Sequence, residues 1–269
     1  MQIDLALYPW PGLLTALVTA LVVSTLGFRR TDWFISVSYG LSIAAQAIIF
    51  PLLLLGRWDI WAGLQAVLLV AYGLRLTTHI LTREKKSSYA KRMEGSSMRS
   101  GKMNVGMKAT MWLSVALLYV LMYSPALMTL NAQAQGSSMA SLPLGLIIMA
   151  LGLFMEGVGD WQKSAAKDKR PDDFVSTGLY RIVRFPNYFG EMLFWAGVWV
   201  SGISAYASVL DWILASIGIL AIQGVMIGSA KGLEKKQNER YGDRADYRGY
   251  VKRTPILFPV VPLYSLAGK

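Results

Sequence analysis

Long apolar runs constrain this chain more than any other feature of its sequence. An α-helix needs about 20 predominantly apolar residues to cross the hydrocarbon core of a bilayer. Segments of that character cover residues 10–28, 33–55, 60–81, 109–130, 143–159, 188–205 and 209–229. Hydrophobic residues make up 54% of the chain, and the mean hydropathy is +0.40. The sequence therefore predicts an all-α, polytopic membrane protein with seven transmembrane helices in a single membrane domain, residues 1–269.

The positions of the basic residues predict the orientation in the membrane. All but two of the 27 Lys and Arg residues lie after the first, third and fifth apolar segments or in the C-terminal tail. The exceptions are Arg57, in a short connection, and Arg75, inside the third segment. Because cytosolic loops are enriched in Lys and Arg, we expect the N-terminus outside and the C-terminus in the cytosol. The net charge of +11 then reflects membrane orientation and contact with membrane lipids, and we expect no nucleic acid partner.

The composition also excludes several classes of site. Cysteine is absent and His79 is the single histidine, which excludes disulfides, thiolate nucleophiles and metal sites built on cysteine or several histidines. We therefore expect no metal. No Gly-x-Gly-x-x-Gly follows a strand pattern and no Walker motif is present, which excludes a Rossmann cofactor site. The short chain and compact loops favour a bacterial inner membrane as the location, with the membrane of the endoplasmic reticulum as the alternative.

Four charged residues within or at the ends of the apolar segments call for an explanation, namely Arg75, Glu156, Asp160 and Glu191. Such a residue costs roughly 2.5–3.5 kcal/mol on insertion scales and is therefore usually paired or functional. Glu156 and Asp160 are four residues apart and share a helix face, as do Asn187 and Glu191. We expect these side chains to converge on a polar pocket open to the cytosol. The alternative is that Arg75 neutralises one carboxylate while the other side chains reach the membrane interface.

The loop between the fifth and sixth segments adds cations to these acids. They are Lys163, Lys167, Lys169, Arg170, Arg181 and Arg184. Cations bind phosphate, whereas carboxylates and an amide can form hydrogen bonds with ribose and base. The pattern therefore favours a nucleotide or dinucleotide ligand. Pro186 suits the first turn of a helix, because its missing N–H costs nothing there. Tyr72 lies one turn before Arg75 and is either a proton donor beside a cation or a packing residue.

Three stretches carry a family resemblance. They are GLFMEGVGDWQKSAAKDK, GLYRIVRFPNYFGEMLFWAGVW and LEKKQNERYGDRADYRGYVKRTPILFP, within residues 152–259. The motifs Gly-Asp-x-Gln-Lys, Arg-x-Pro-Asn-Tyr-x-Gly-Glu and Tyr-x-x-Tyr-x-x-Arg-Thr-Pro occur in this order. Together they resemble the C-terminal domain of the steroid 5-alpha-reductase-like family, in particular its bacterial branch formerly of unknown function.

The resemblance implies an NADPH-dependent oxidoreductase acting on CH–CH groups, similar to a 3-oxo-5-alpha-steroid 4-dehydrogenase. Its substrate would be a lipophilic, steroid-like or isoprenoid-like molecule with an activated carbon–carbon double bond. Residues 1–130 would form the substrate side and residues 143–269 the cofactor side. The implied catalytic residues are Tyr72 as proton donor, Arg75 and Glu191. The implied cofactor-binding residues are Glu156, Asp160, Lys163, Lys167, Arg181, Arg184, Asn187, Tyr188, Glu191 and Trp195.

The chain departs from the family pattern at two places. Phe185 stands where the family commonly has a histidine. Ser36 and Val37 stand where steroid-reducing members carry a Gln-Glu pair that anchors the substrate carbonyl. A carbonyl anchor is therefore absent or is supplied from elsewhere, for example by Gln46 or Gln65.

Two other functions compete with the reductase. Membrane methyltransferases of the isoprenylcysteine or phospholipid type share the arginine-proline-tyrosine-glycine-glutamate step and bind S-adenosylmethionine there. The many cations favour a cofactor that carries phosphate, which S-adenosylmethionine lacks. The remaining alternative is a non-catalytic lipid-binding or assembly protein that keeps the fold.

Overall fold

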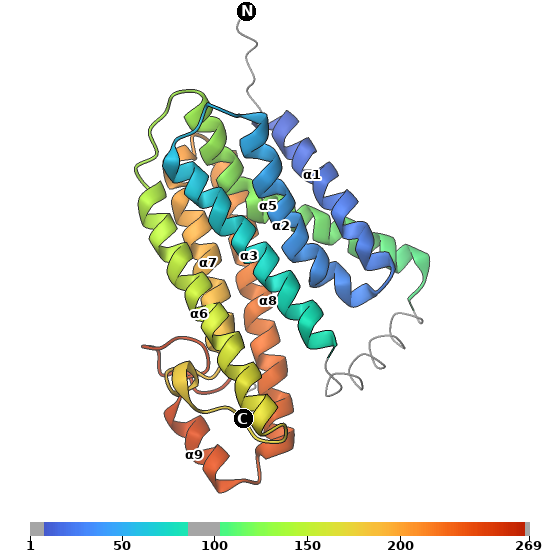
Figure 1. Ribbon diagram of the computed structural model, residues 1–269, viewed down its shortest axis with the longest axis vertical. Coiled ribbons are helices and arrows are strands. Elements are labelled where there is room, and N and C mark those ends of the chain that lie inside the picture. The colour runs from blue at the N-terminus through green and yellow to red at the C-terminus, as the bar shows by residue number, and fades with distance from the viewer. Residues whose placement is uncertain (1–7, 86–102, 267–269) are drawn as a thin grey trace, which may run out of the picture. The chain divides into compact units, whose positions relative to one another are not determined.

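The structure is a computed structural model that describes residues 8–85 and 103–266 (Figure 1). These residues form helices and turns and contain no β-strand, which confirms the all-α prediction for the described part of the chain. The long helices are α1 (Trp10–Ser24), α2 (Val37–Leu53), α3 (Ile60–Glu84), α5 (Val105–Ala134), α6 (Leu142–Lys169), α7 (Pro186–Ser201) and α8 (Val209–Tyr241), and a shorter helix, α9 (Ala245–Arg253), follows. Single 3-10 turns are η1 (Thr25–Phe28), η2 (Thr31–Ile35), η4 (Gly178–Arg181) and η5 (Ile203–Ala205).

Five of these helical stretches are long and apolar enough to cross a membrane. They are residues 10–28 and the helices α3, α5, α6 and α8. The fold is therefore that of an integral membrane protein. The helix α2 is apolar but has 17 residues, and α7 has 16, so both are shorter than the usual span. Most of the basic connection expected between residues 83 and 108 lies outside the described residues.

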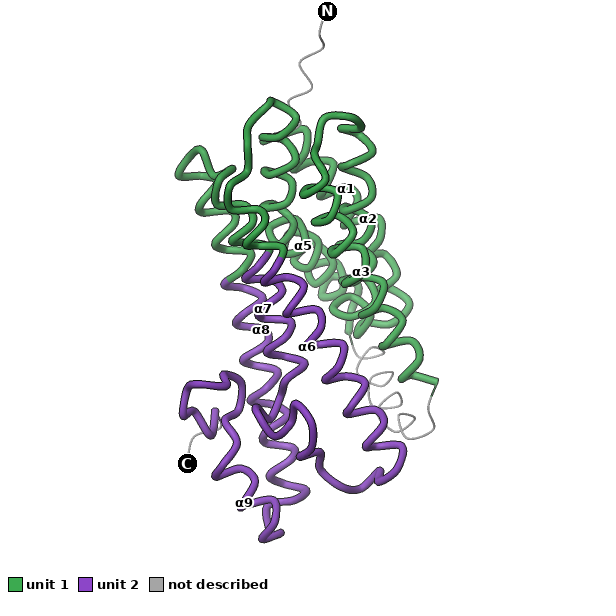
Figure 2. The backbone as a smooth tube through the Cα atoms, turned by 60° about the vertical axis from the view of Figure 1, so that its left-hand side comes forward, with its two compact units in different colours: residues 1–146, 198–219 green, residues 147–197, 220–269 purple. Residues whose placement is uncertain are grey.

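The chain divides into two compact units, coloured separately in Figure 2. Unit 1 comprises residues 1–146 and 198–219, and unit 2 comprises residues 147–197 and 220–269. The units differ from the expected halves, residues 1–130 and 143–269, because the end of α7 and the start of α8 belong to unit 1. The assignment of substrate and cofactor to different parts of the chain stays a prediction.

In unit 1, α2 and α3 pack through a pair of glycines and lie side by side in Figure 1. A Cβ atom on Gly40 would lie 2.5 Å from the Gly73 carbonyl oxygen, and one on Gly73 would lie 2.2 Å from that of Gly40. Small residues allow such close backbone contact between helices in a membrane, where apolar packing alone drives association weakly. An open apolar groove of about 430 Å³ runs along the same two helices, with Trp58 among its lining residues.

Candidate functional site

In unit 2, glycines bring α6 and α7 into direct backbone contact. A Cβ atom on Gly152 would lie 2.4 Å from the Phe194 nitrogen, and one on Gly190 would lie 2.4 Å from the Glu156 nitrogen. The third glycine, Gly159, faces the first turn of α7 in the same way. No side chain fits between the helices at these points. The acidic residues beside the glycines are therefore held where the two helices meet.

Three carboxylates are buried at this contact. The exposed fraction is 2% for Glu156 and 9% for Asp160 on α6, and 6% for Glu191 on α7. Asn187 lies next to Gly159, since a Cβ on that glycine would be 3.0 Å from the Asn187 nitrogen. The expected grouping of Glu156 and Asp160 with Asn187 and Glu191 in one part of the structure is consistent with this contact.

The amide oxygen of Asn187 is a buried acceptor at the contact between α6 and α7. Its Oδ1 atom is buried and has no hydrogen-bond partner among the residues that the structure describes. Buried polar atoms are nearly always hydrogen-bonded, so an orphaned acceptor calls for a donor from water or a ligand. A ligand N–H or O–H placed between α6 and α7 would satisfy it.

The start of α7 is fixed by the C-terminal tail. The Arg184 backbone N–H donates to the Pro255 carbonyl at 2.9 Å, and that of Phe185 donates to the Ile256 carbonyl at 3.2 Å. The helix then begins at Pro186, as its missing N–H predicts. Backbone carbonyls at the end of the third motif therefore hold the backbone of the second motif in place.

Phe185 is a packing residue in this structure. Its ring is fully buried and stacks on Tyr188, with ring centroids 5.9 Å apart and an interplanar angle of 28°. An apolar contact thus occupies the position where the resembled family commonly places a titratable imidazole.

Arg184 forms a buried ion pair. Its Nη2 atom donates to Glu234 Oε1 at 2.7 Å and to the Tyr264 carbonyl at 2.6 Å. Both charged side chains are 1% exposed, and Glu234 Oε2 accepts from the Leu266 N–H at 2.8 Å. The Nη2 atom of Arg184 therefore joins the start of α7 to α8 and to the tail, whereas its Nε and Nη1 atoms are buried and have no hydrogen-bond partner among the described residues.

Lys167 is also engaged within the protein. Its ammonium group donates to the carbonyls of Pro171 and Asp173 and, at 3.2 Å, to the Tyr241 hydroxyl. An ammonium has three hydrogens, so these bonds use its donor capacity. A phosphate role for Lys167 would require this arrangement to change. Of the other expected phosphate ligands, Arg181 is exposed and Lys163 is half-buried.

Gln162, the glutamine of the first motif, shapes the loop after α6. Its Oε1 atom accepts from the Leu179 N–H at 2.8 Å. Gly178 adopts a positive φ of 61°, and a Cβ there would lie 2.4 Å from Gln162 Oε1. Only glycine suits both the left-handed backbone and the close approach.

Tyr180 ties the same loop back to α6. Its hydroxyl donates to the Gly159 carbonyl at 3.2 Å. Burial raises the pKa of the Tyr180 phenol well above its ordinary value, and the Asp160 carboxylate raises it further. The phenol is therefore neutral and acts as a hydrogen-bond donor next to the buried acids.

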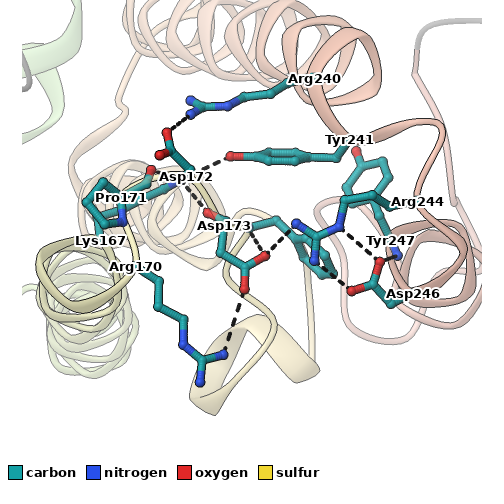
Figure 3. A network of polar contacts seen from close by, with 11 residues as sticks. Lys167, Arg170, Pro171, Asp172, Asp173, Arg240, Tyr241, Arg244, Asp246 and Tyr247 are labelled. Carbon is teal, nitrogen blue, oxygen red and sulfur yellow. Dashed lines mark hydrogen bonds and ion pairs between the residues drawn. The ribbon is translucent and has the colours of Figure 1, made fainter.

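The segment that contains the third motif packs around Phe174 in an aromatic cluster that the sequence did not predict; Tyr241, Arg244 and Tyr247 of this cluster are labelled in Figure 3. The ring of Phe174, from the loop between α6 and α7, contacts Tyr241, Tyr247 and Tyr250, with centroid distances of 5.8, 5.2 and 5.4 Å. The guanidinium of Arg244 lies 5.1 Å from the centre of the Phe174 ring. We call these five residues the aromatic clasp.

Ion pairs flank the clasp on the loop side. Arg240 pairs with Asp172, and Arg244 pairs with Asp173 at 2.9 Å and with Asp246 at 2.7 Å. A hydrogen bond from Arg244 lowers the pKa of the exposed Asp246 carboxyl. The sequence contains two parts of this cluster, namely the Asp-Asp-Phe triplet and a C-terminal segment rich in Tyr and Arg. Only the tertiary fold shows that these two parts contact each other.

The two expected aromatic cofactor contacts, Tyr188 and Trp195, both lie on α7. Tyr188 is half-buried against Phe185, whereas Trp195 is 2% exposed and packs edge-on against Phe194 at 5.5 Å. Trp195 is therefore a core residue of unit 2 in this structure.

The expected proton donor lies in unit 1. The Tyr72 side chain is fully buried, and its hydroxyl donates to the Tyr39 hydroxyl at 2.7 Å. Tyr39 in turn stacks on Tyr119, whose hydroxyl donates to the Phe34 carbonyl. Arg75 follows on the same helix and is half-buried. The convergence of Tyr72 and Arg75 with the acids of unit 2 stays a prediction, and Tyr72 does not line the apolar groove along α2 and α3.

The two glutamines considered as carbonyl anchors differ. Gln65 Nε2 donates to Ser201 Oγ at 2.5 Å, so its amide is engaged in unit 1. Gln46 Nε2 donates to the Ser42 carbonyl at 3.1 Å, but its buried Oε1 accepts no hydrogen bond from the described residues. The Ser36 hydroxyl donates to the Asp32 carbonyl at 2.7 Å and serves the local turn.

These features define an integral membrane protein in which acids are buried between two helices in backbone contact. The chain belongs to the family described as "Protein of unknown function (DUF1295)", which matches residues 22–254. It is 37% identical over 87 residues to an uncharacterized protein of Schizosaccharomyces pombe, a match that covers 32% of this chain and 24% of that protein. The match thus spans about a quarter of the relative's length. No solved structure matches the chain.

Proposed function

We propose that this protein is a membrane-embedded, NADPH-dependent reductase of an activated carbon–carbon double bond in a lipophilic, steroid-like or isoprenoid-like substrate. The observation that carries the proposal is the buried acidic contact between α6 and α7 with its orphaned Asn187 acceptor. The motifs shared with the steroid 5-alpha-reductase-like family give that contact its chemical interpretation.

The proposal includes seven spans, an external N-terminus and a cytosolic C-terminus. At 1.5 Å per residue, α2 and α7 rise about 26 and about 24 Å, slightly less than the roughly 30 Å core of a bilayer. The 3-10 turns η2 and η5 adjoin these helices and lengthen the ordered segments. The basic loops then face one side, where the site would open to the cytosol of a bacterial inner membrane.

The fit of NADPH to unit 2 can be judged from its side chains. Asp160, Asn187 and Glu191 supply buried acceptors for the amide and hydroxyl groups of a nicotinamide ribose. Fewer cations are available for phosphate than expected, because Lys167 and Arg184 already bind other groups of the protein. We therefore assign phosphate binding to Lys163 and Arg181. The cofactor supplies the hydride when bound. The chain orients it, excludes water, and supplies the proton from the Tyr72 hydroxyl near Arg75.

A methyltransferase of the isoprenylcysteine or phospholipid type is the second candidate. The internal engagement of Lys167 and Arg184 favours it, because S-adenosylmethionine carries no phosphate and needs fewer cations. Its ammonium and ribose groups would find acceptors in the same three residues, Asp160, Asn187 and Glu191.

Ligand-induced thermal stabilisation separates the two candidates. The purified protein is heated with NADPH or with S-adenosylmethionine, each at increasing concentration. A specific ligand at 100 times its dissociation constant stabilises the folded state by about 2.7 kcal/mol. We expect NADPH to raise Tm and Glu191→Gln to abolish the rise. The matched control is Glu239→Gln, which changes an exposed acid on α8 and should leave the rise intact. A rise with S-adenosylmethionine alone would refute the reductase.

A further inference from the structure

The C-terminal tail of unit 2 exposes an apolar turn. The Val261 N–H donates to the Phe258 carbonyl at 3.3 Å, which closes a turn with Pro259 and Val260 at its tip. Val260 is 92% exposed and Val261 is 44% exposed. These adjacent valines lie between two prolines and form an exposed apolar patch in a tail that otherwise carries many charges.

This turn is held rigidly at its base. The Ile256 N–H donates to the Leu263 carbonyl at 2.8 Å, which brings the two arms of the turn together. Beyond the arms, the Tyr264 carbonyl and the Leu266 N–H are held by the buried pair of Arg184 and Glu234. The exposed valines therefore sit on a fixed support.

The support lies at the level where α7 begins. The Phe185 N–H donates to the Ile256 carbonyl, and the ring of Phe258 contacts that of Phe189 edge-on at 6.0 Å. Phe189 is in the first turn of α7, after which the sequence MLFWAGVWV is apolar. The turn is thus attached at the point where the chain enters its apolar segment.

Two other exposed apolar side chains belong to residues near the contact between α6 and the start of α7. Trp161 follows Asp160 on α6, close to the contact between Gly159 and Asn187, and Ile182 precedes the start of α7. Trp161 is 69% exposed and Ile182 is 49% exposed. Tryptophan is enriched at the interface between lipid and water, so this region has the composition of a membrane interface.

We propose that the turn Phe258–Val261 inserts its valines into the interfacial layer of the lipid bilayer and anchors the tail there. The lipid surface covers Val260 and Val261, and Pro259, which has no N–H, leaves one fewer backbone donor at the tip of the turn. The inference depends on the geometry of unit 2 and holds whichever cofactor the protein binds.

The absence of cysteine makes the test direct. A nitroxide is attached to Val260→Cys, and the protein is reconstituted into vesicles of phosphatidylethanolamine and phosphatidylglycerol. Collision rates of the label with oxygen, which concentrates in lipid, and with a water-soluble nickel chelate are measured by electron paramagnetic resonance. Because Val260 makes little contact with the rest of the chain, the substitution should leave folding unchanged. Val261→Cys provides a second reporter in the same turn.

Two labelled positions in unit 2 calibrate the result. Lys252→Cys is exposed on α9 and reports water, and Leu220→Cys is exposed on the apolar part of α8 and reports lipid. We expect an oxygen-to-nickel ratio at Val260 several-fold above that at Lys252 and close to that at Leu220. A ratio at both valines equal to that at Lys252 would show that the turn lies in water and would overturn the proposal.

Discussion

Removing one partner of the buried pair between Arg184 and Glu234 should destabilise unit 2 strongly. Both side chains are 1% exposed, and Glu234 also accepts from the Leu266 N–H. In Glu234→Leu, the guanidinium would remain buried without its counter-ion. Leaving such a charge unpaired typically costs about 3–5 kcal/mol. For a chain of this size, that corresponds to a decrease in Tm of roughly 6–20 °C.

The double variant Arg184→Met/Glu234→Leu tests the cause of that loss. Apolar residues of similar volume often replace a buried ion pair with little change in stability. We therefore expect the double variant to recover most of the stability that Glu234→Leu loses. Part of the loss should remain, because the Tyr264 carbonyl and the Leu266 N–H lose their partners in both variants.

An exposed pair on the same helix provides the control. Arg240 and Asp172 are 53% and 94% exposed, and solvent-exposed pairs contribute about 0–1 kcal/mol. Thermal unfolding of Asp172→Asn should therefore stay close to that of the unaltered protein. If Glu234→Leu behaves like Asp172→Asn, or if the double variant is no more stable than Glu234→Leu, the reasoning from burial is wrong.

The other predictions use the same thermal assay or limited proteolysis. Gly190→Ala should cost about 1–3 kcal/mol because its methyl group meets the α6 backbone, whereas Gly228→Ala, with open space around it, should be neutral or stabilising by up to about 1 kcal/mol. Phe174→Ala should speed trypsin cleavage of the loop between α6 and α7 by emptying the aromatic clasp; an unchanged rate would mean that the clasp does not hold the loop. Because Arg244 lowers the pKa of folded Asp246, the pair's contribution is present above the unfolded pKa and is lost as pH falls through the folded one. The difference in Tm between the unaltered protein and Asp246→Asn should therefore be small near neutral pH and vanish in acid.

The sequence predicts best those features that depend on local pattern. The apolar segments became helices, and Pro186 begins α7 because its ring and missing N–H suit a first turn. The spacing of Glu156 with Asp160, and of Asn187 with Glu191, correctly placed these residues on helix faces. Glycine contacts then determine that the two faces meet, which residue spacing alone does not specify.

The roles of the cations between the fifth and sixth apolar segments were harder to predict from the sequence than the helices. Lys167 and Arg184 look like phosphate ligands in a list of charges, yet their partners are an aromatic hydroxyl, loop carbonyls and Glu234, fifty positions along the chain from Arg184. Whether a cation serves a ligand or the fold depends on such long-range contacts. The Pro-Asp-Asp sequence directly after α6 was a local clue, since a lysine in the last turn of a helix often binds the carbonyls that follow.

The contact between α6 and α7 has a consequence for the diversity of related proteins. Gly152, Gly159 and Gly190 bring the helices into backbone contact, so a larger residue at any of these positions would push the pair apart. A descendant could exchange Glu156 for another polar residue and keep the same helix pair. The glycines are therefore the positions that the backbone packing of this helix pair requires, whereas the polar residue at position 156 is not fixed by that backbone contact.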